Sequence, residues 1–439
     1  MTERGSDAAA TLRELEAQGV RFLLLQFTDL LGVNKAVELP LAQAPKALAE
    51  GVLFDGSALE GFARTEEADA LLVPDLATFR VFPWTGPPEV MARLICDIRY
   101  PDGRSFEGCP RTALKRQIES AGRLGYVPLV SAEVEFFLFE QGTETRDAGS
   151  YFDLGGIDEG ERTRRTISGI IEDMKLGPAA SHHEVGRGQH EIDLGLTDPL
   201  SLADNIVTLR FVLRSIARRS GLIATVMPKP TYGRSGSGMH THQTLIAKGK
   251  NAFFDPKGPE KLSDVSRRYI AGLLRHARGY SAVTNPLVNS YKRLVGGFEA
   301  PVDVSWSTQN VSPLIRVPAE RGDATRCENR LPDPAANPYL AILVQLAAGL
   351  DGITEKLDPG DPINKNIARM SYRERRRYRI DQLPRDLHEA LDYLEKDRVI
   401  RDALGEHIYE RYLEAKHEEW SEYIEHVSAW EIDRYLGRY

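Results

Sequence analysis

The sequence is poor in the features that mark several large protein classes. Its 439 residues include three cysteines, and an odd, sparse set of cysteines gives no disulfide framework and suits a reducing compartment. No run of about 18 apolar residues is present, so we expect no membrane span. The first residues are charged and lack the apolar core of a signal peptide. These absences together predict a cytoplasmic protein.

Several motifs of catalysis and binding are also missing. The chain has neither a CxxC pair nor an HExxH motif, which argues against structural or protease-type zinc. It has no GxxxxGK[ST] loop, so a Walker-type nucleotide site is not supported. Acidic residues outnumber basic ones by 64 to 56, and the formal net charge is −8. Because the chain lacks the excess of cations that displaces counterions from phosphates, we expect no nucleic acid among its partners.

The pattern of apolar residues predicts an α+β protein with two unequal domains. Residues 8–19 and 40–51 are predicted to form helices, the second closed by Gly51, and strand-like segments fill most of the chain up to about residue 108. An amphipathic helix is predicted to begin at Pro110, because proline suits the first turn of a helix. The predicted domains are residues 16–106 and 110–439.

Four short segments of the larger domain carry polar side chains two residues apart, which places each pair on one face of a strand. The segments contribute Glu133 and Glu135, then Gln189, Glu191 and Asp193, then His240 and His242, and finally Glu328 and Arg330. A hairpin through residues 186–188 would bring Glu184 beside Glu191. One such pair is usually a solvated strand face. Four in one chain, amid apolar neighbours, fit that explanation less well.

The residue types in these segments point to metal and phosphate chemistry. Carboxylates are unfavourable to bury together unless they are paired or hold cations. Glutamates with a histidine form a natural ligand set for hard divalent ions such as Mg²⁺ or Mn²⁺. Arginines recur in the C-terminal half, at positions 293, 316, 326 and 330. Cations with several arginines suit phosphoryl transfer, whose transition state is stabilised chiefly by positioning and positive charge.

Six ordered motifs resemble signatures of the glutamine synthetase family. They are FDGSALEGFAR, AEVEFFLF, SHHEVGRGQHEI, MPKPTYGRSGSGMHTH, NSYKRLVGGFEAP and RCENRLPDPAANPYLA. The ending VSAWEIDRYLGRY is also similar to the family's C-terminus, so the resemblance extends from about residue 18 to residue 439. It is closest to the type I, feedback-inhibited subgroup. The resemblance implies a small β-grasp-like N-terminal domain and a catalytic domain built on a half-barrel of strands.

The activity implied by the resemblance is ATP-dependent ligation of ammonia to the γ-carboxylate of glutamate through γ-glutamyl phosphate. It implies two or more Mg²⁺ or Mn²⁺ ions in each active site. It also implies a homododecamer of two stacked hexameric rings, with active sites between subunits. Ammonium is not nucleophilic until it loses a proton, so a carboxylate must act as a base. A flap at residues 296–301 would shield the acyl phosphate from water.

The resemblance assigns roles to particular residues. The implied metal ligands are Glu135, Glu184 and Glu191 for one ion, and Glu133, His240 and Glu328 for the other. The implied contacts to ATP phosphates are His242, Arg316 and Arg326, of which Arg316 is also catalytic. The implied contacts to glutamate are Gly236, Arg293, Glu299 and Arg330. Asp55 of a neighbouring subunit and Glu299 would bind ammonium and take its proton, and Arg64 would mediate feedback inhibition by glutamine.

Four positions depart from the family's usual pattern. Ser235 replaces an asparagine expected to contact glutamate, Phe298 lacks a hydroxyl on the flap, and Ala58 replaces a serine. Val311 replaces an arginine, and valine cannot reproduce the contacts of a guanidinium to phosphate. Three interpretations therefore stay open: a working glutamine synthetase, a γ-glutamyl ligase for another amine or acid, or a weakly active or non-catalytic relative. The retained ammonium-binding carboxylates favour ammonia over a bulky amine.

Overall fold

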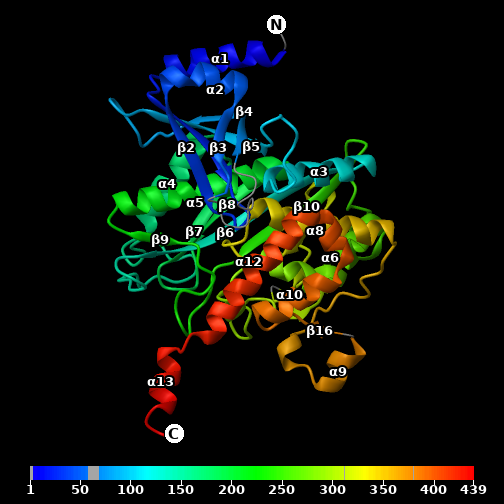
Figure 1. Cartoon of the computed structure of the whole chain (residues 1–439). Helices are drawn as coiled ribbons and strands as arrows, with labels where there is room; N and C mark the ends of the chain where they lie inside the picture. Colours follow the sequence, from blue (N-terminus) through cyan, green and yellow to red (C-terminus); the bar gives the residue numbers. More distant parts are fainter. Residues whose placement is uncertain (1–2, 58–68, 311, 379) are drawn as a thin grey trace.

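The computed structural model describes residues 3–57, 69–310, 312–378 and 380–439, and it has a small N-terminal β-sheet domain seated on a larger α+β body (Figure 1). The small domain holds a five-stranded sheet in the order β2-β1-β5-β4-β3. Its strands are β1 (Phe22–Thr28), β2 (Asn34–Pro40), β3 (Val52–Asp55), β4 (Asp69–Val81) and β5 (Met91–Arg99). Helices α1 (Glu3–Ala17) and α2 (Ala44–Glu50) lie over this sheet.

Apolar side chains of β1 and α2 explain why this small domain holds together. Leu23 and Leu25 lie two residues apart on β1, which places them on one face of the strand, and both are fully buried in the same hydrophobic cluster as Ala47 and Leu48 of α2. Helix α2 ends at Gly51, whose φ of 80° is a backbone conformation that favours glycine. The predicted C-cap is therefore confirmed.

The larger body is organised around a nine-stranded sheet with the main order β13-β14-β15-β10-β6-β8-β7. These strands are β6 (Val127–Phe139), β7 (Pro178–His183), β8 (Gln189–Thr197), β10 (Met239–Ala247), β13 (Trp306–Ser307), β14 (Ile315–Arg316) and β15 (Cys327–Asn329). Two short strands join from the side, β9 (Ile223–Thr225) on β6 and β11 (Lys250–Asn251) on β10. The predicted hairpin is confirmed, because β7 and β8 pair antiparallel through the turn at residues 184–188.

Helices surround this sheet, and the most buried of them is α8 (Pro338–Thr354). Its sequence is apolar on nearly every side, as expected for a helix enclosed by other elements. It packs tightly on α6 (Asp264–Thr284), where a Cβ added to Gly272 would lie 2.0 Å from the carbonyl oxygen of Ala348. The other long helices of the body are α3 (Pro110–Arg123), α4 (Glu161–Asp173), α5 (Pro199–Arg219), α10 (Leu387–Lys396) and α12 (Glu406–Glu425).

The remaining elements are short or lie at the margin of the body. They are α7 (Ser290–Arg293), α9 (Tyr372–Arg377), α11 (Arg398–Leu404), α13 (Ala429–Tyr435) and the paired strands β12 (Asp303–Val304) and β16 (Asp381–Gln382). Helix α13 extends away from the body at the C-terminus (Figure 1). No helix within the described residues is long and apolar enough to cross a membrane.

The register of the large sheet decides which polar side chains meet. Antiparallel pairing sets Glu133 of β6 opposite His240 of β10. On the other side of β6, Glu135 lies opposite Glu191 of β8. Glu328 of β15 pairs with His242 of β10 and with Arg316 of β14. Because side chains at paired positions share a face, these five strands place their charged residues in one cluster.

Candidate active site

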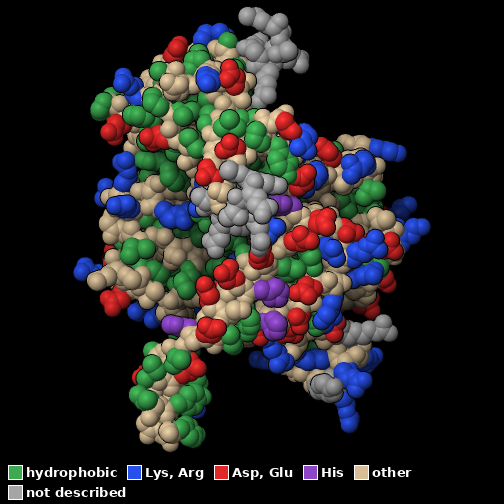
Figure 2. Space-filling model, in the orientation of Figure 1, with side chains coloured by type: hydrophobic (Ala, Val, Ile, Leu, Met, Phe, Trp, Pro, Cys, Tyr) green, Lys and Arg blue, Asp and Glu red, His purple; other side chains and the backbone are tan. Residues whose placement is uncertain are grey.

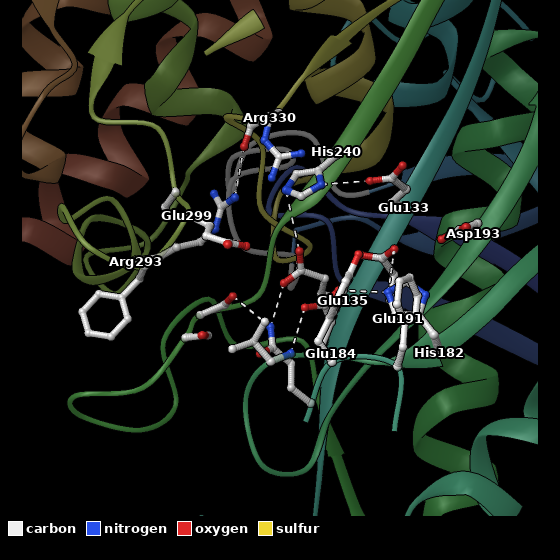
Figure 3. Close-up of a pocket in the computed structure, with 18 of the residues that line it drawn as sticks. Glu133, Glu135, His182, Glu184, Glu191, Asp193, His240, Arg293, Glu299 and Arg330 are labelled. Atoms are coloured by element: carbon white, nitrogen blue, oxygen red, sulfur yellow. Dashed lines mark hydrogen bonds and ion pairs between the residues drawn. The ribbon is translucent and has the colours of Figure 1, made fainter. Parts of the chain in front are cut away.

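A cavity of about 520 Å³ lies over the face of the large sheet that carries these charged side chains (Figure 3). Strands β6, β8 and β10 supply its floor, and loops supply its rim. Its lining includes eleven of the residues singled out in the sequence, which are Glu133, Glu135, Glu184, Gln189, Glu191, Asp193, His240, Arg293, Glu299, Arg316 and Arg330. Segments spread over nearly 200 residues of sequence thus converge on one cavity.

One side of the cluster is organised around Glu133. Its two carboxylate oxygens face two histidines, with Nδ1 of His240 at 3.0 Å from Oε2 and Nε2 of His242 at 2.7 Å from Oε1. Nδ1 of His240 also lies 3.8 Å from Oε1 of Glu328. Glu328 is itself fully buried and pairs with Arg316 at 2.9 Å and with Arg330. Glutamates, histidine and arginines therefore form a continuous charged network.

The other side of the cluster is rich in carboxylates and has few cations. Oε1 of Glu135 lies 3.6 Å from Nε2 of His240. Nε2 of His182 lies 3.0 Å from Glu184 and 3.6 Å from Glu191. Figure 3 shows these side chains pointing toward one another from β6, β8 and the hairpin turn.

Burial makes this carboxylate-rich side reluctant to carry its full negative charge. Burial and the neighbouring charge of Glu184 raise the pKa of Glu135 to about 8. Burial, together with Glu135 and Glu133, raises the pKa of Glu191 well above its ordinary value. Burial also raises the pKa of Asp193. Several carboxylates thus share a space that holds too little positive charge of its own.

The arginine- and histidine-rich side has the opposite electrostatics. Burial alone would raise the pKa of Glu133, but hydrogen bonds from His240 and His242 outweigh it and lower that pKa. Burial also opposes ionisation of Glu328, yet the charge of Arg330 prevails and lowers its pKa. Both carboxylates are therefore held ionised, as cation ligands must be.

The donor set fits divalent cations. Three triads in this cavity bring ligand atoms within 4.8 Å of one another, and they are Glu133–His240–Glu328, Glu135–Glu191–His240 and His182–Glu184–Glu191. Carboxylate oxygens with one imidazole suit Mg²⁺ or Mn²⁺. Cations here would also relieve the repulsion that raises the pKa values of Glu135 and Glu191. The first triad is one of the two implied ligand sets, and members of the other set are divided between the remaining triads.

Arg293 and the loop before β10 form the wall next to the carboxylate cluster. Arg293, at the end of α7, is 3% exposed and donates to the carbonyl oxygens of Leu331 at 2.7 Å and Arg330 at 3.0 Å. Its side chain crosses Gly236, where an added Cβ would lie 3.1 Å from Cβ of Arg293. Ser235 and Gly236 both line the cavity. This wall places a buried guanidinium and the backbone of Gly236 at the edge of the cavity, where an anionic substrate could bind.

The predicted flap covers the rim of the cavity with Phe298 and Glu299. Glu299 has a φ of 59°, which is uncommon for a residue other than glycine and holds its side chain at the rim. The ring of Phe298 lies under Lys229, with Nζ at 3.9 Å from the ring centroid. Nζ of Lys229 also donates to the carbonyl of Arg234. Lys229 therefore links the flap to the loop that carries Ser235 and Gly236.

Several predicted site residues lie elsewhere. Asp55 ends β3 in the small domain and is exposed. Its carboxylate accepts from the hydroxyl of Ser57 at 2.6 Å and from the backbone N–H of Ser57 at 2.9 Å, and these bonds lower the pKa of Asp55. It does not line the cavity of its own chain. His242 and Arg326 adjoin the cavity behind Glu133, with Nε of Arg326 3.3 Å from Nδ1 of His242. Ala58, Arg64 and Val311 fall outside the described residues.

Three lining residues with ring side chains, Tyr151, Phe152 and His182, received no role from the sequence. Tyr151 and Phe152 come from the irregular segment before α4, and their rings contact each other and His182. No periodicity or charge pattern marks that segment. His182 does lie in the SHHEV motif, two residues before Glu184 on the same face of the hairpin, and that spacing was the available signal.

Comparison with known proteins gives a consistent result over the whole chain. Residues 19–101 match the family described as glutamine synthetase, beta-Grasp domain, and residues 107–435 match glutamine synthetase, catalytic domain. A glutamine synthetase of Thermus thermophilus is 52% identical and aligns over 99% of this chain and 100% of its own length. Those of Methanosarcina mazei and Clostridium saccharobutylicum are each 48% identical over 97% of both chains.

Solved structures resemble this fold from end to end. One described as a GmaS/ADP complex in conformation 1 is 33% identical, covers 100% of both chains and gives a TM-score of 0.89. Another, described as apo GmaS without ligand, is also 33% identical and covers 97% of this chain and 99% of its own, with a TM-score of 0.88. The architecture described above therefore has close structural counterparts.

Proposed function

The chain belongs to the glutamine synthetase family, and we propose that the cavity over its large sheet is the active site in which glutamate, ATP and ammonia react. The chain is an ATP-dependent ligase that makes glutamine. The predicted β-grasp-like and half-barrel architecture is confirmed, and we place the boundary between the two domains within residues 106–110. The observation that carries the active-site proposal is the convergence of five metal-ligand candidates and three arginines on the lining of one cavity, with the sixth candidate, Glu328, in contact with Arg316 of that lining.

Divalent cations, Mg²⁺ or Mn²⁺, would be held by Glu135, Glu184 and Glu191 on one side and by Glu133, His240 and Glu328 on the other. They would supply positive charge against the phosphates of ATP. The positions of all six side chains support this assignment, because each side chain contributes a ligand atom to at least one of the three triads.

Arginines and the substrate loop would hold the reactants in line. Arg316 and Arg326, with His242, lie on the side of Glu133 and Glu328 and would contact the phosphates of ATP. Arg293 and Arg330, with the backbone of Gly236, would hold glutamate so that its γ-carboxylate faces the γ-phosphate. Transfer of that phosphoryl group gives γ-glutamyl phosphate and ADP. Positive charge at the transferred group stabilises this step.

The second step joins nitrogen to the activated carbonyl. Glu299 lies at the rim, where a carboxylate can hold ammonium and accept its proton. Ammonia then attacks the acyl carbon, and phosphate leaves. The flap at residues 296–301 would exclude water, which otherwise hydrolyses the acyl phosphate. The exposure of Asp55, far from its own cavity, supports its use in the site of a neighbouring subunit.

We propose a homododecamer of two hexameric rings as the working assembly, and Arg64 as the residue through which glutamine inhibits the enzyme. Light scattering on the purified protein would measure the assembly. Replacement of Arg64 by alanine would be expected to leave turnover intact and raise the glutamine concentration needed for inhibition.

The amine acceptor is tested by phosphate release from ATP with glutamate and Mg²⁺, adding ammonium, hydroxylamine and a panel of alkylamines in turn. The 48–52% identity to curated glutamine synthetases supports ammonium as the acceptor. Ammonium is expected to give the largest kcat/KM. Release that depends on an alkylamine and not on ammonium would replace this function by ligation of another amine. Release that ignores glutamate would contradict the ligase.

A further inference from the structure

Gln189, the first residue of β8, has a side chain that joins three parts of the cavity. The side chain is 1% exposed. Its Nε2 donates to Oε2 of Glu135 at 2.7 Å and to the carbonyl oxygen of Gly236 at 3.1 Å. Its Oε1 accepts a hydrogen bond from the backbone N–H of Gly186 at 3.0 Å. One amide thus connects β6, the loop before β10 and the turn of the β7–β8 hairpin.

The chemistry of the three partners fixes the orientation of this amide. A carboxylate and a carbonyl on one side can only accept, and a backbone N–H on the other side can only donate. If the amide were flipped, its oxygen would face the oxygens of Glu135 and Gly236, and its NH₂ group would face the backbone N–H of Gly186. The fit is close, because a Cβ added to Gly186 would lie 2.6 Å from Oε1 of Gln189.

These contacts decide which oxygen of Glu135 is left for a cation. Oε2 accepts from Gln189 and also from the backbone N–H of Gly238 at 3.0 Å. Oε1 instead faces the triad, 3.6 Å from Nε2 of His240. Two donors on Oε2 therefore turn Oε1 toward the cation position.

The same residue also fixes a second carboxylate. The backbone carbonyl of Gln189 accepts from the N–H of Glu184 at 2.8 Å, and its side chain holds Gly186, two residues further along the turn. Gln189 thereby holds the short segment from Glu184 to Gly186 at both of its ends. On the other side, the bond to Gly236 holds the loop proposed to contact glutamate.

We propose that Gln189 is a positioning residue that sets Glu135 and Glu184 for cation binding and joins them to the glutamate loop. This inference rests on the proposed function of the cavity. Partners that orient metal ligands typically change metal affinity by about 10- to 100-fold when removed. Methionine keeps the length of glutamine without its hydrogen bonds. Glutamate keeps the shape but sets a second carboxylate against Glu135.

The test measures Mn²⁺ binding directly, by electron paramagnetic resonance of the free ion, on the full chain without substrates. The wild type is compared with Gln189→Met and Gln189→Glu. The control is Gln345→Met, because Gln345 of α8 is also a 1%-exposed glutamine, and its Oε1 accepts from Thr241, Gln243 and Asn329 in the core. Loss of either glutamine removes buried hydrogen bonds, and only the loss of Gln189 should alter the cation ligands.

Both Gln189 variants are expected to bind Mn²⁺ about 10- to 100-fold more weakly and to raise the KM for glutamate, while Gln345→Met binds Mn²⁺ like the wild type. Wild-type affinity in Gln189→Met would overturn the positioning role and leave the proposed function intact. A wild type that binds no Mn²⁺ would overturn the proposed function itself. Failure of both Gln189 variants to fold where Gln345→Met folds would also overturn the proposal, because Gln189 would then serve general stability.

Discussion

At the scale of single residues, the cavity separates carboxylates that are held ionised from carboxylates that resist ionisation. Glu133 and Glu328 have partners with positive charge or N–H donors, and their pKa values are lowered despite burial. Glu135 and Glu191 face mostly other carboxylates, and their pKa values are raised by burial and by those neighbours. A cation would be drawn chiefly to the second pair, where negative charge is least compensated.

This asymmetry predicts how the metal-free protein responds to pH. A carboxyl group with a pKa of about 8 in the folded chain and an ordinary value when unfolded stabilises the fold fully at low pH. That contribution is lost as pH rises toward 8, because ionisation is easier in the unfolded chain. We expect the unfolding free energy in EDTA to fall between about pH 5 and 8, with a smaller fall in Glu135→Gln. Denaturant titrations at several pH values measure both slopes.

Added Mg²⁺ should reverse the trend, since cation binding requires the ionised carboxylates and therefore strengthens as pH rises. Equal pH slopes for wild type and Glu135→Gln in EDTA would show that Glu135 does not carry the raised pKa.

At the scale of helices and strands, His276 links three helices outside the cavity. Its Nε2 lies 2.9 Å from Asp351 of α8, and its Nδ1 lies 2.7 Å from Asp397, the N-cap of α11. Burial alone would lower its pKa, but hydrogen bonds to Asp397 and Asp351 outweigh burial and raise it. The resulting stabilisation is complete below the ordinary histidine pKa and is lost as pH rises through the raised one.

We therefore expect His276→Gln to destabilise the chain more at pH 6 than at pH 9, by about 1–3 kcal/mol at the lower pH, because two partly buried carboxylates lose a charged donor. The measurement is the difference in denaturant midpoints between wild type and variant at each pH. A difference that does not change with pH would contradict a charged His276.

The flap is a second element whose behaviour can be tested. Replacement of Lys229 by methionine removes the cation over Phe298 and its bond to the carbonyl of Arg234. Cation–π contacts contribute about 0.5–2 kcal/mol, so we expect a flap that opens roughly 2- to 30-fold more often. Phosphate release without ammonium should then rise relative to glutamine formation.

The chain offers a matched control for this flap prediction. Lys292→Met removes a cation 5.3 Å from the ring of Tyr423, a contact with a side chain that does not line the cavity. The ratio of uncoupled release to glutamine formation should stay at the wild-type value in that variant. An unchanged ratio in Lys229→Met would contradict the role of the contact in closing the flap.

Much of the arrangement of strands could be predicted from the sequence, because the two-residue periodicity of a strand determines which side chains share a face. Pairs two residues apart placed Glu133 and Glu135 on one face, and the Gly-rich turn predicted the β7–β8 hairpin. Register across strands is set by long-range packing, which local pattern does not contain. Tyr151 and Phe152 lie in an irregular segment without periodicity. The hydrogen-bond partners of Gln189 lie up to 54 residues away from it in the chain.

At the scale of the whole molecule, the cavity of one chain lacks Asp55, one of the two carboxylates proposed to bind ammonium. Asp55 lies on the small domain, away from the cavity, while Glu299 lies at its rim. Helix α13 also extends outward, and hydrophobic side chains gather on this C-terminal extension (Figure 2). Trp430 and Ile432 of the helix are exposed, as is Leu436 directly after it. Exposed apolar surface of this kind suits contact with another subunit. Both features support an oligomer whose active sites lie between subunits.

Shared sites predict complementation between inactive subunits. Asp55→Ala and Glu299→Ala oligomers should each lose most of their glutamine synthesis. Mixed oligomers, formed by co-expression with two different tags and purified through both, should regain activity, because some interfaces then hold both wild-type residues. The absence of any recovery in verified mixed oligomers would place Asp55 outside a shared site.

Taken as a whole, the molecule joins ammonia to the γ-carboxylate of glutamate and converts ATP to ADP and phosphate. Incubation of the wild-type protein with glutamate, ATP, Mg²⁺ and ¹⁵N-ammonium, followed by proton–nitrogen NMR, tests this reaction most directly. We predict a γ-amide signal of glutamine that grows in equal amount with ADP and vanishes when any reactant is withheld. ADP formation without a ¹⁵N-amide, in the presence of saturating ammonium, would contradict the account.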